Sequence, residues 1–554
     1  MARLAPLVYR LSEPGFTIYH RAALGGLAAT IRAWNANGVP APLRYEPERA
    51  TGGGTLHGPD ATQVTIRMDA TEISLDWPSE TPDRKALGVL LEASFRRTEE
   101  GMIELPGLGL GRNREEVLLA VHSGLAQTFL QHNKKRPGKG VGTVALKIGD
   151  EDQPAIFTFK RVDRYSHQVA QGTGLLGEGW DVSPGEPPEV VTLSQALLPG
   201  AMAGASELEA RPRDAFLLQY LIVACPVFLV RSRRREEKVR SSLIVPDVTD
   251  LRHFSMRLHR ASSRDLPRFS DTYLGRVVGG AEEAALRFLI DLRSHRAAGG
   301  LGVSSFLVVA MGKVPWDKNQ QNRSGIARVG TRYDEMAVFE AAAGHLSKSR
   351  VVLNKKGEPF AIPDCPVPEL IAANLAGGEH WCAHFRDLVV KKQDFLNLSY
   401  RREGLHAMQG AVSQEKRGLE DRLVIQCFQE AWRLKMRSFW DRSGGNKKVF
   451  QWLTDRERER IRNDILRCKT SDGLANWLLR FAADASRPTE KRPASPLMTF
   501  KEKAEELRRI IFNPRDMDRL QNLLLFALIS YASDRAQDDE GGQAAPGSAI
   551  DHNE

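Results

Sequence analysis

The sequence predicts an α+β body with mixed sheets, followed by an all-α helical bundle. Two observations support this fold class. Up to about residue 400, segments with polar and apolar residues alternating at period two are mixed with segments of helical period, and beyond it only the helical period remains. We expect a body over residues 1–400, for which two subdomains with a break near residues 200–240 are one option. A bundle over residues 401–533 and a disordered tail over residues 534–554, which lacks apolar periodicity, should follow.

The first expected element is a helix from Ile18 to Trp34, with Thr17 as its N-cap. One helical face carries large apolar side chains, and another carries only small residues at positions 22, 26, 29 and 33. A glycine inside a helix costs roughly 1 kcal/mol relative to alanine, so the Gly25–Gly26 pair should be compensated by the close approach of another backbone. The alternative is that this pair kinks the helix beside a nucleic acid.

Short strands and helices should alternate over the rest of the body. Period-two segments predict strands at 63–68, 72–77, 142–149, 155–161, 242–245 and 306–310, and helical periods predict helices at 113–130 and 281–293. Gly107, Gly109 and Gly111 lack the strand and the spacing of a dinucleotide-binding loop. They predict a tight loop before the helix at 113–130.

The bundle should contain amphipathic helices at 414–439, 449–468, 472–482, 500–511 and 515–531, with a proline-rich linker at 486–496. The basic surplus lies in this region. Residues 401–519 hold 27 Lys and Arg against 18 Asp and Glu, a surplus as large as the net charge of +9 of the whole chain. A sequence pI of about 9.3 favours a polyanionic partner over an acidic small substrate.

The cysteine pattern predicts a cytoplasmic protein without disulfides. The five cysteines are an odd number, are widely separated and contain no C-x-x-C pair. No signal sequence is expected, because Arg3 and Arg10 interrupt the first apolar residues. The longest apolar run, residues 215–230, is broken by Gln219 and Pro226, so no membrane partner is expected.

Motifs of common enzymes are absent from the sequence, which contains no G-x-x-x-x-G-K-[ST], H-E-x-x-H or G-x-S-x-G. We therefore expect no enzyme activity, no catalytic residues and no cofactor. The one metal-like cluster is His380, Cys382 and His384, in which the two histidines would share a helical face at i and i+4. A partly buried helix surface explains this spacing equally simply, so no metal site is predicted.

Basic clusters provide candidates for contacts to phosphates. A glycine-rich basic segment contains Lys134, Lys135, Arg136 and Lys139, and backbone amides and ammonium groups of such segments suit phosphates. Further candidates are Arg233, Arg234, Arg235, Lys447 and Lys448. Each cluster alone would be a solvated surface, but together with the net charge they favour nucleic-acid binding.

The segment VPWDKNQQNR, residues 314–323, places a burst of polar side chains after the buried strand expected at 304–311. It should be a polar loop that closes this strand. Asn and Gln each carry a donor and an acceptor and suit adenine edges, whereas Arg and Lys suit guanine and phosphate. A plain surface turn is the alternative.

Three segments together resemble the large subunit of type I CRISPR Cascade complexes, in the Myxan variant. They are the helix start from Gly15 to Leu27, the strand exit from Leu243 to Leu251, and the strand followed by Gly312–Arg323. The order of a mixed body and a helical C-terminal domain is similar too. The resemblance implies a non-catalytic subunit that recognises the protospacer-adjacent motif on target double-stranded DNA, supports R-loop formation and recruits a helicase-nuclease in antiviral defence.

The implied partners are the guide RNA, the target DNA, the Cascade backbone and small subunits, and the helicase-nuclease, or a transposition adaptor if a transposon encodes the complex. Physical reasoning adds roles to residues of the polar segment. Candidates for base contacts are Lys318, Asn319, Gln320, Gln321, Asn322 and Arg323, with Trp316 as an anchor or a wedge beside a base step.

Two other hypotheses remain open. The chain could be an RNA-binding or scaffold subunit that recognises no motif, or a metal-dependent nuclease that uses Glu379, His380 and His384. Because Met408 lies near the boundary between body and bundle, we also hypothesise that an internal start there yields a separate small subunit.

Overall fold

The computed structural model describes most of the chain. The described residues are 3–48, 50–108, 115–129, 140–146, 154–162, 165, 175–176, 189–193, 208–234, 240–263, 277–293, 300–314, 317–347, 349–353, 359–413, 416–488 and 493–531. The tail expected at 534–554 lies outside them. By its internal contacts the chain forms two compact units, residues 1–333 with 347–378, and residues 334–346 with 379–554. We call them the α+β unit and the helical unit; the domain ranges expected from the sequence stay predictions.

The α+β unit begins with an antiparallel sheet of five strands. They are β1 (Leu7–Arg10), β2 (Arg44–Glu48), β3 (Gly53–His57), β4 (Gln63–Met68) and β5 (Glu72–Asp76), in the order β1-β5-β4-β3-β2. On β4, Val64, Ile66 and Met68 are buried while the residues between them are partly or fully exposed. The period-two pattern of this segment therefore reflects one buried face, and the predicted strand is confirmed.

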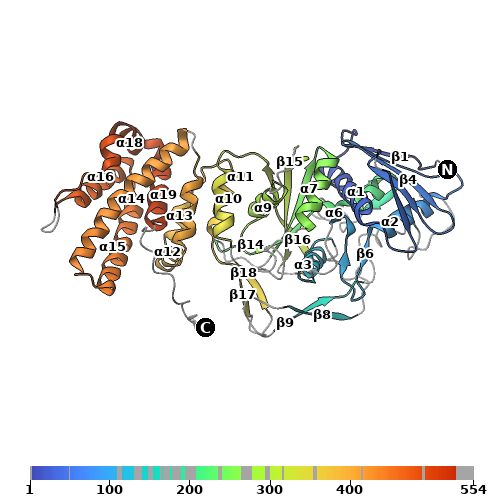
Figure 1. Cartoon of the computed structure of the whole chain (residues 1–554), viewed down its shortest axis with the longest axis horizontal. Coiled ribbons are helices and arrows are strands. Elements are labelled where there is room, and N and C mark those ends of the chain that lie inside the picture. The colour runs from blue at the N-terminus through green and yellow to red at the C-terminus, as the bar shows by residue number, and fades with distance from the viewer. Residues whose placement is uncertain are drawn as a thin grey trace. The chain divides into compact units, whose positions relative to one another are not determined.

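Helix α1 (Ile18–Asn37) is the central helix of this unit (Figure 1). It packs against α5 (Pro212–Leu218), α6 (Leu221–Ala224) and α7 (Leu251–Ser263). A Cβ atom on Gly26 would lie 2.1 Å from the carbonyl oxygen of Tyr220, so the expected close approach of another backbone is confirmed. Thr17 is the N-cap, as predicted, and its backbone N–H donates to Nδ1 of His20 at 3.2 Å.

A second, mixed sheet has the order β14-β12-β13-β15-β16. Its strands are β12 (Val227–Val230), β13 (Arg240–Val248), β14 (Val277–Val278), β15 (Val303–Val314) and β16 (Asp317–Gly330). β12 and β14 are parallel, and the other neighbours are antiparallel. Because α1 and α9 (Ala281–Arg293) both pack against β13, residues 241–246 of this strand are all buried. A strand covered on both faces has no polar alternation, which explains its continuous apolar run.

Smaller elements complete the α+β unit. They are the strand pairs β6 (Arg96–Arg97) with β7 (Ile103–Glu104), β8 (Val141–Leu146) with β9 (Ala155–Lys160), β10 (Val191–Leu193) with β11 (Leu208–Ala210) and β17 (Ser349–Leu353) with β18 (Pro359–Pro363), and the helices α2 (Asp83–Ser94), α3 (Glu115–Gln127) and α11 (Val367–Ala376). Gly107 lies in the 3-10 turn η1 (Pro106–Leu108), where a Cβ atom would lie 2.6 Å from Oγ1 of Thr30. This glycine therefore lets η1 approach α1.

The helical unit contains no strand among its described residues. Its helices are α10 (Met336–His345), η4 (Phe385–Val389), α12 (Lys392–Ser399), α13 (Arg402–Ala411), α14 (Lys416–Arg442), α15 (Lys447–Arg467), α16 (Ser471–Ser486), α17 (Met498–Glu502), α18 (Ala504–Ile511), η5 (Pro514–Asp516) and α19 (Met517–Ser530). Residues 520–530 of α19 are all buried, and α13, α14, α15 and η4 pack around this helix. A helix that is apolar on every side belongs in the centre of a bundle.

The predicted fold class, an α+β region with mixed sheets followed by a helical region, is confirmed (Figure 1). All five cysteines are free thiols, in agreement with their spacing. Within the described parts of the chain, no helix combines the length and apolar character that crossing a membrane requires.

Candidate nucleic-acid interface

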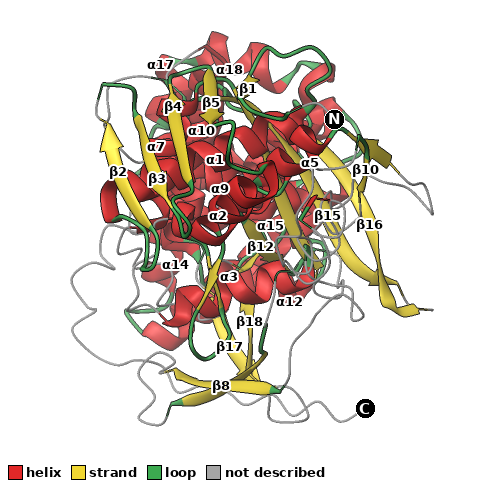
Figure 2. Cartoon of the chain, turned by 90° about the vertical axis from the view of Figure 1, so that its right-hand side faces the viewer, coloured by secondary structure: helices red, strands yellow, loops and turns green. Residues whose placement is uncertain are grey.

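β15 and β16 form a hairpin that is longer than the sheet to which it belongs. On β15, only residues Val303 to Met311 pair with β13, whereas pairing with β16 continues up to Val314 of β15. Past Met311 the two strands therefore pair only with each other, at the edge of the sheet (Figure 2). We call this part, residues 312–314 with 317–323, the β15–β16 ribbon.

The six candidates for base contacts all lie on the ribbon. Met311 pairs with Arg323, Gly312 with Asn322 and Lys313 with Gln321, but Val314 already pairs with Asp317. The three residues between, 318–320, are thus bulged out of the pairing. A bulge bends a strand and redirects its side chains, and bulges are frequent beside binding sites.

The prediction of a polar loop after the buried strand was wrong for residues 317–323, because these residues continue the hairpin as strand β16. Asn, Gln and Asp have low strand propensity, so their composition favours a loop. Pairing of residues 317 and 321–323 with β15 holds this segment in the hairpin and overrides that propensity. Trp316, the proposed anchor, lies outside the described residues.

Only some of the basic residues predicted to contact phosphates lie among the described residues. Lys134, Lys135, Arg136, Lys139 and Arg235 lie outside the described residues. Arg233 and Arg234 follow β12 in a bend, and the carboxylate of Glu369 fixes this bend. Oγ of Ser232 donates to Oε1 of Glu369 at 2.7 Å, and the backbone N–H of Arg233 donates to Oε2 at 3.2 Å.

Glu369 itself is 7% exposed, and burial raises the pKa of this carboxyl to about 7. The hydrogen bond from Ser232 opposes that shift, and the neighbouring carboxylate of Glu283 adds to it. Glu283 is neutralised in turn by Arg287, whose Nη2 lies 2.9 Å from it. The bend that presents Arg233 therefore depends on a carboxyl that titrates near neutral pH.

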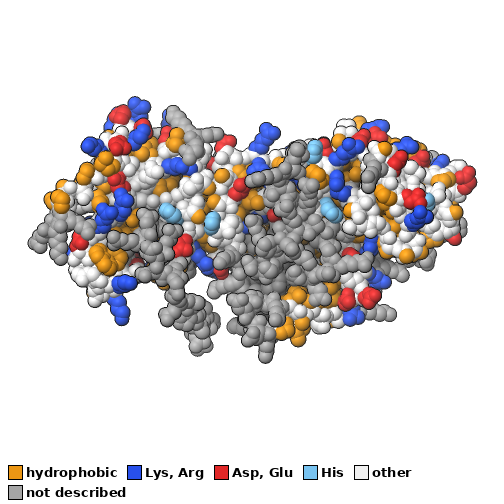
Figure 3. Space-filling model, in the orientation of Figure 1, with side chains coloured by type: hydrophobic (Ala, Val, Ile, Leu, Met, Phe, Trp, Pro, Cys, Tyr) orange, Lys and Arg blue, Asp and Glu red, His pale blue; other side chains and the backbone are white. Residues whose placement is uncertain are grey.

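Lys447 and Lys448 are the first residues of α15 and are exposed. The side chain of Asn446 caps this helix by accepting from the backbone N–H of Lys448 at 3.0 Å and of Val449 at 3.2 Å. Cations at a helix N-terminus are disfavoured by the helix dipole, so these lysines do not stabilise α15 through that dipole. On the face shown in Figure 3, basic and acidic side chains are interspersed over the described surface.

The three residues of the weak metal candidate do not converge. Residues 379–384 form turns rather than a helix, so the expectation that His380 and His384 share a helical face was wrong. His384 is half exposed and pairs with Glu379 at 3.0 Å, whereas His380 is buried and faces other partners. Burial raises the pKa of the Cys382 thiol, which makes it a poor metal ligand.

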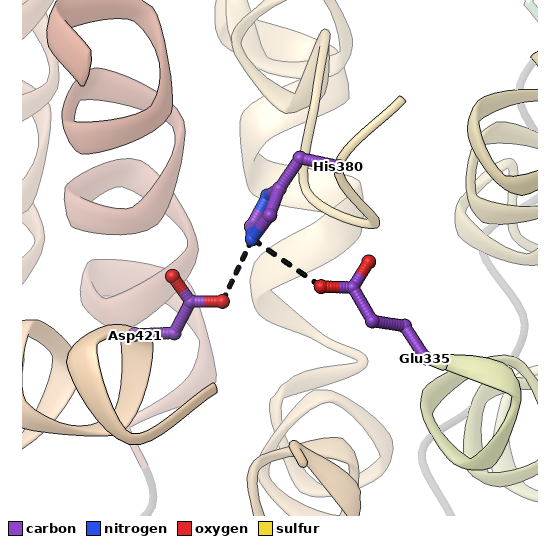
Figure 4. A group of neighbouring side chains, drawn as sticks. All are labelled: Glu335, His380 and Asp421. Carbon is purple, nitrogen blue, oxygen red and sulfur yellow. Dashed lines mark hydrogen bonds and ion pairs between the residues drawn. The ribbon is translucent and has the colours of Figure 1, made fainter. Parts of the chain in front are cut away.

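His380 instead joins Glu335 and Asp421 in a buried polar cluster (Figure 4). Nε2 of His380 lies 2.7 Å from Oδ2 of Asp421 and 3.7 Å from Oε1 of Glu335. The backbone N–H of Cys382 donates to Nδ1, so the proton lies on Nε2 and is donated to Asp421.

The remaining bonds of Asp421 come from Trp381 and Arg519. Nε1 of Trp381 donates to Oδ2 at 3.0 Å, and Nη2 of Arg519 donates to Oδ1 at 2.7 Å. Burial alone would raise the pKa of Asp421, but the hydrogen bond from His380 and the charge of Arg519 lower it. Both carboxylate oxygens therefore accept hydrogen bonds. The cluster fits a structural role better than a metal centre, since it links the 379–384 turns to α14 and α19.

Sequence reasoning did not find Glu335, Asp421 or Arg519 as partners of His380. In the sequence, each of these three residues lies at least 41 residues away from His380 and from the other two. Isolated acidic and basic residues at such spacing carry no sequence signal, since only packing of the helices brings them together.

Comparisons with known proteins agree with this architecture. Residues 8–219 match the DevT N-terminal domain and residues 413–552 match the DevT C-terminal domain. A relative from Myxococcus xanthus (strain DK1622), CRISPR-associated protein Cas8a1/Csx13, is 26% identical over 569 residues, which cover 98% of this chain and 90% of the relative. Together with the fold, these matches define a CRISPR-associated large subunit.

More particularly, both DevT domains, the N-terminal and the C-terminal one, are matched in this chain and in that order. The resemblance to a type I CRISPR large subunit seen in the sequence is thereby confirmed at the level of the family.

Proposed function

We propose that this chain is the large subunit of an RNA-guided type I Cascade complex and recognises the protospacer-adjacent motif on target double-stranded DNA. The observation that carries this proposal is the similarity to a CRISPR-associated protein along 98% of the chain. In such complexes the guide RNA specifies sequence by base pairing, and a protein recognises only a short flanking motif.

The β15–β16 ribbon is the element that suits this recognition. The major groove of B-DNA admits a two-stranded β-ribbon, and each base pair presents a distinct pattern of donors and acceptors there. The ribbon extends past β13 and carries four consecutive amide side chains, Asn319 to Asn322, between Lys318 and Arg323. Gln and Asn can each bond an adenine edge through two atoms, and Arg can do the same with guanine.

Contacts to phosphates would supply most of the affinity. We assign this role to Lys134, Lys135, Arg136, Lys139, Arg233, Arg234, Arg235, Lys447 and Lys448. Phosphate contacts carry no sequence information, so motif discrimination and overall affinity should respond to different substitutions. Affinity should also fall steeply with salt.

The other roles follow from membership of a Cascade complex. The chain assembles in the cytoplasm with guide RNA, backbone and small subunits, supports R-loop formation, and recruits a helicase-nuclease or, in a transposon, an adaptor. It acts without catalysis of its own. The alternative nuclease site fails to form among the described residues, because His384 pairs with Glu379 while His380 faces Asp421.

A double substitution tests motif recognition. Gln320→Ala with Gln321→Ala should weaken binding of the assembled complex to target DNA by about 1–3 kcal/mol for each bidentate hydrogen-bond pair removed, because base edges are left without their partners. Binding is measured by gel shift on duplexes with the preferred and with a scrambled flanking sequence. The matched control is Arg328→Ala, an exposed residue of β16 outside the ribbon.

The proposal predicts that the double variant binds both duplexes alike, while the control still prefers one. Unchanged discrimination in the double variant, with intact assembly, would exclude the ribbon as the recognition element. Binding to RNA without any dependence on flanking DNA would favour the scaffold hypothesis.

The internal start proposed at Met408 has a structural consequence. Met408 is buried in the middle of α13, so a product beginning there would lack α10, the 379–384 turns and α12. Such a product would lack His380 and Trp381, which bond Asp421. Mass spectrometry of the purified complex tests whether it is made.

A further inference from the structure

Cations gather in a groove of about 900 Å³ in the helical unit, between α12, α13 and α15. Four basic side chains line it, Lys392, Arg402, Arg456 and Arg458. Nζ of Lys392 lies 2.9 Å from the carboxylate of Glu459. Within the described parts of the chain, Arg402 and Arg456 form no ion pair. Two cations of the groove are therefore available to an anionic ligand.

Arg458 is the most buried of the four cations, at 8% exposed. Its Nε is buried without a hydrogen-bond partner, and its Nη1 lies 3.9 Å from Asp455. Burial lowers the pKa of Arg458 and the charge of Arg402 lowers it further, whereas Asp455 and Tyr531 oppose these effects. Two cations therefore lie near enough to repel each other, and a carboxylate beside them relieves that repulsion.

The described part of the chain ends beside this groove. α19 packs against α12, α13 and α15, the three helices that line it (Figure 1). Nε2 of Gln409 on α13 donates to the carbonyl oxygen of Ser530 at 3.3 Å and to its Oγ at 2.7 Å. The next residue, Tyr531, is close enough to Arg458 to influence its pKa. The chain that follows Tyr531 therefore starts next to the groove.

The C-terminal tail, residues 534–554, is strongly acidic. It contains six acidic residues and one arginine, and three of the acidic residues are consecutive, Asp538, Asp539 and Glu540. Asp538 lies seven positions after Tyr531, so it can reach at most roughly 25 Å from that residue. A short link gives an effective concentration in the millimolar range, so even weak ion pairs between these carboxylates and the groove are populated.

We propose that residues 538–540 dock into the groove of the same chain, with their carboxylates against Arg402, Arg456 and Arg458. The tail is then an intramolecular anionic ligand, which shields these cations until a stronger anion displaces it. A chain with a net charge of +9 is prone to non-specific binding of polyanions, and the docked tail limits such binding. The β15–β16 ribbon takes no part in this contact, so docking and motif recognition can fail separately.

Zero-length cross-linking of the full-length chain tests the docking. The carbodiimide EDC joins a carboxylate to a lysine amine where the two groups are in contact, and Lys392 is the one lysine among the residues that line the groove. Mass spectrometry should find residues 538–540 linked to Lys392, and not to the exposed Lys469, Lys501 or Lys503. The link between Lys392 and Glu459, which are 2.9 Å apart, is the internal reference.

Removal of the arginines should lower the yield of this link. Arg402→Ala with Arg456→Ala takes away two exposed ion pairs with the tail, so the yield should fall by roughly 2- to 30-fold. Arg467→Ala with Arg480→Ala is the matched control. It removes the same charge from exposed positions that do not line the groove, and it should leave the yield unchanged.

Heparin chromatography measures the shielding with two variants that each lose three carboxylates of the tail. The first variant is Asp538→Asn/Asp539→Asn/Glu540→Gln. The second, its matched control, is Asp534→Asn/Asp551→Asn/Glu554→Gln. The first should elute at a higher salt concentration than the second, because both gain the same net charge but only the first frees the arginines of the groove. Adding Arg402→Ala and Arg456→Ala to both variants should abolish the difference.

Absence of links to Lys392 while the reference link forms, or links from residues 538–540 to lysines outside the groove, overturns the proposal. An unchanged yield in Arg402→Ala with Arg456→Ala overturns it too. Links between isotope-labelled and unlabelled chains in a mixture would place the tail of one copy on another and overturn the intramolecular contact. Equal elution of the two tail variants would overturn the shielding.

Discussion

Replacing Asp421 with asparagine should destabilise the helical unit by about 3–5 kcal/mol, the cost of breaking a buried ion pair. Asp421 is fully buried and accepts hydrogen bonds from His380, Trp381 and Arg519. Asparagine keeps the size of the side chain but removes its charge. The guanidinium of Arg519, with a side chain only 9% exposed, then keeps only partners that are more exposed or weaker: Glu420, which is 33% exposed, Asp516 at 4.0 Å, and the carbonyl oxygen of Arg417.

Differential scanning calorimetry measures this effect. For a unit of this size, 1 kcal/mol corresponds to about 2–4 °C, so the melting temperature should fall by roughly 6–20 °C. Asp518→Asn is the matched control, because its carboxylate is 76% exposed and its ion pair with Arg386 lies at the surface. Such pairs contribute about 0–1 kcal/mol.

A decrease no larger than that of the control would refute the role of the buried network. A chelator provides a second test. If EDTA lowered the melting temperature of the wild-type chain, Asp421 and His380 would be metal ligands, and the description of the cluster as a structural hydrogen-bond network would be wrong.

Gly26→Ala and Glu369→Gln test packing and ionisation in the α+β unit, with Gly344→Ala in the helical unit as a control for the first. Gly26→Ala should destabilise the chain by about 1–3 kcal/mol, because the new Cβ would lie 2.1 Å from the carbonyl oxygen of Tyr220. Gly344→Ala in α10, with no atom within 4 Å, should instead stabilise it by up to about 1 kcal/mol, and equal effects would contradict this. Because the folded pKa of Glu369, about 7, exceeds its ordinary value of 4.5, wild-type stability should fall by about 3 kcal/mol as pH rises through this window. In thermal melts, Glu369→Gln should therefore stabilise the chain at pH 8 and have little effect at pH 5; an equal effect at both would refute the assignment.

The regular elements could be predicted because their hydrophobic periods reflect one buried face. The helix expected at 281–293 is α9 with the same bounds, and the strand expected at 63–68 is β4. The helices expected at 414–439, 449–468, 472–482 and 515–531 were predicted to within a few residues for the same reason, whereas the one expected at 500–511 is divided into α17 and α18, and α12 and α13 were not predicted. Even the small-residue face of α1 predicted its close neighbour, since glycine in a helix requires compensation.

The features that escaped prediction depend on the packing of distant segments against one another. Residues 317–323 have the composition of a loop, and only the pairing of residues 317 and 321–323 with β15 makes the segment part of a strand. The row of arginines at 456, 458, 460 and 462 looks uniformly basic in the sequence. In the structure Arg458 and Arg462 are buried while Arg456 and Arg460 are exposed, because helical period, not composition, decides which side chains face inward.

The central claim, that this chain recognises the motif flanking the target, is tested most directly by selection from a randomised library. The assembled complex, with and without this chain, is incubated with duplexes that carry one target and random flanking bases, and the bound DNA is sequenced. We predict that the complete complex enriches one short motif and that the complex without this chain, or with Gln320→Ala and Gln321→Ala, enriches none. Enrichment of the same motif in the absence of this chain would contradict the claim.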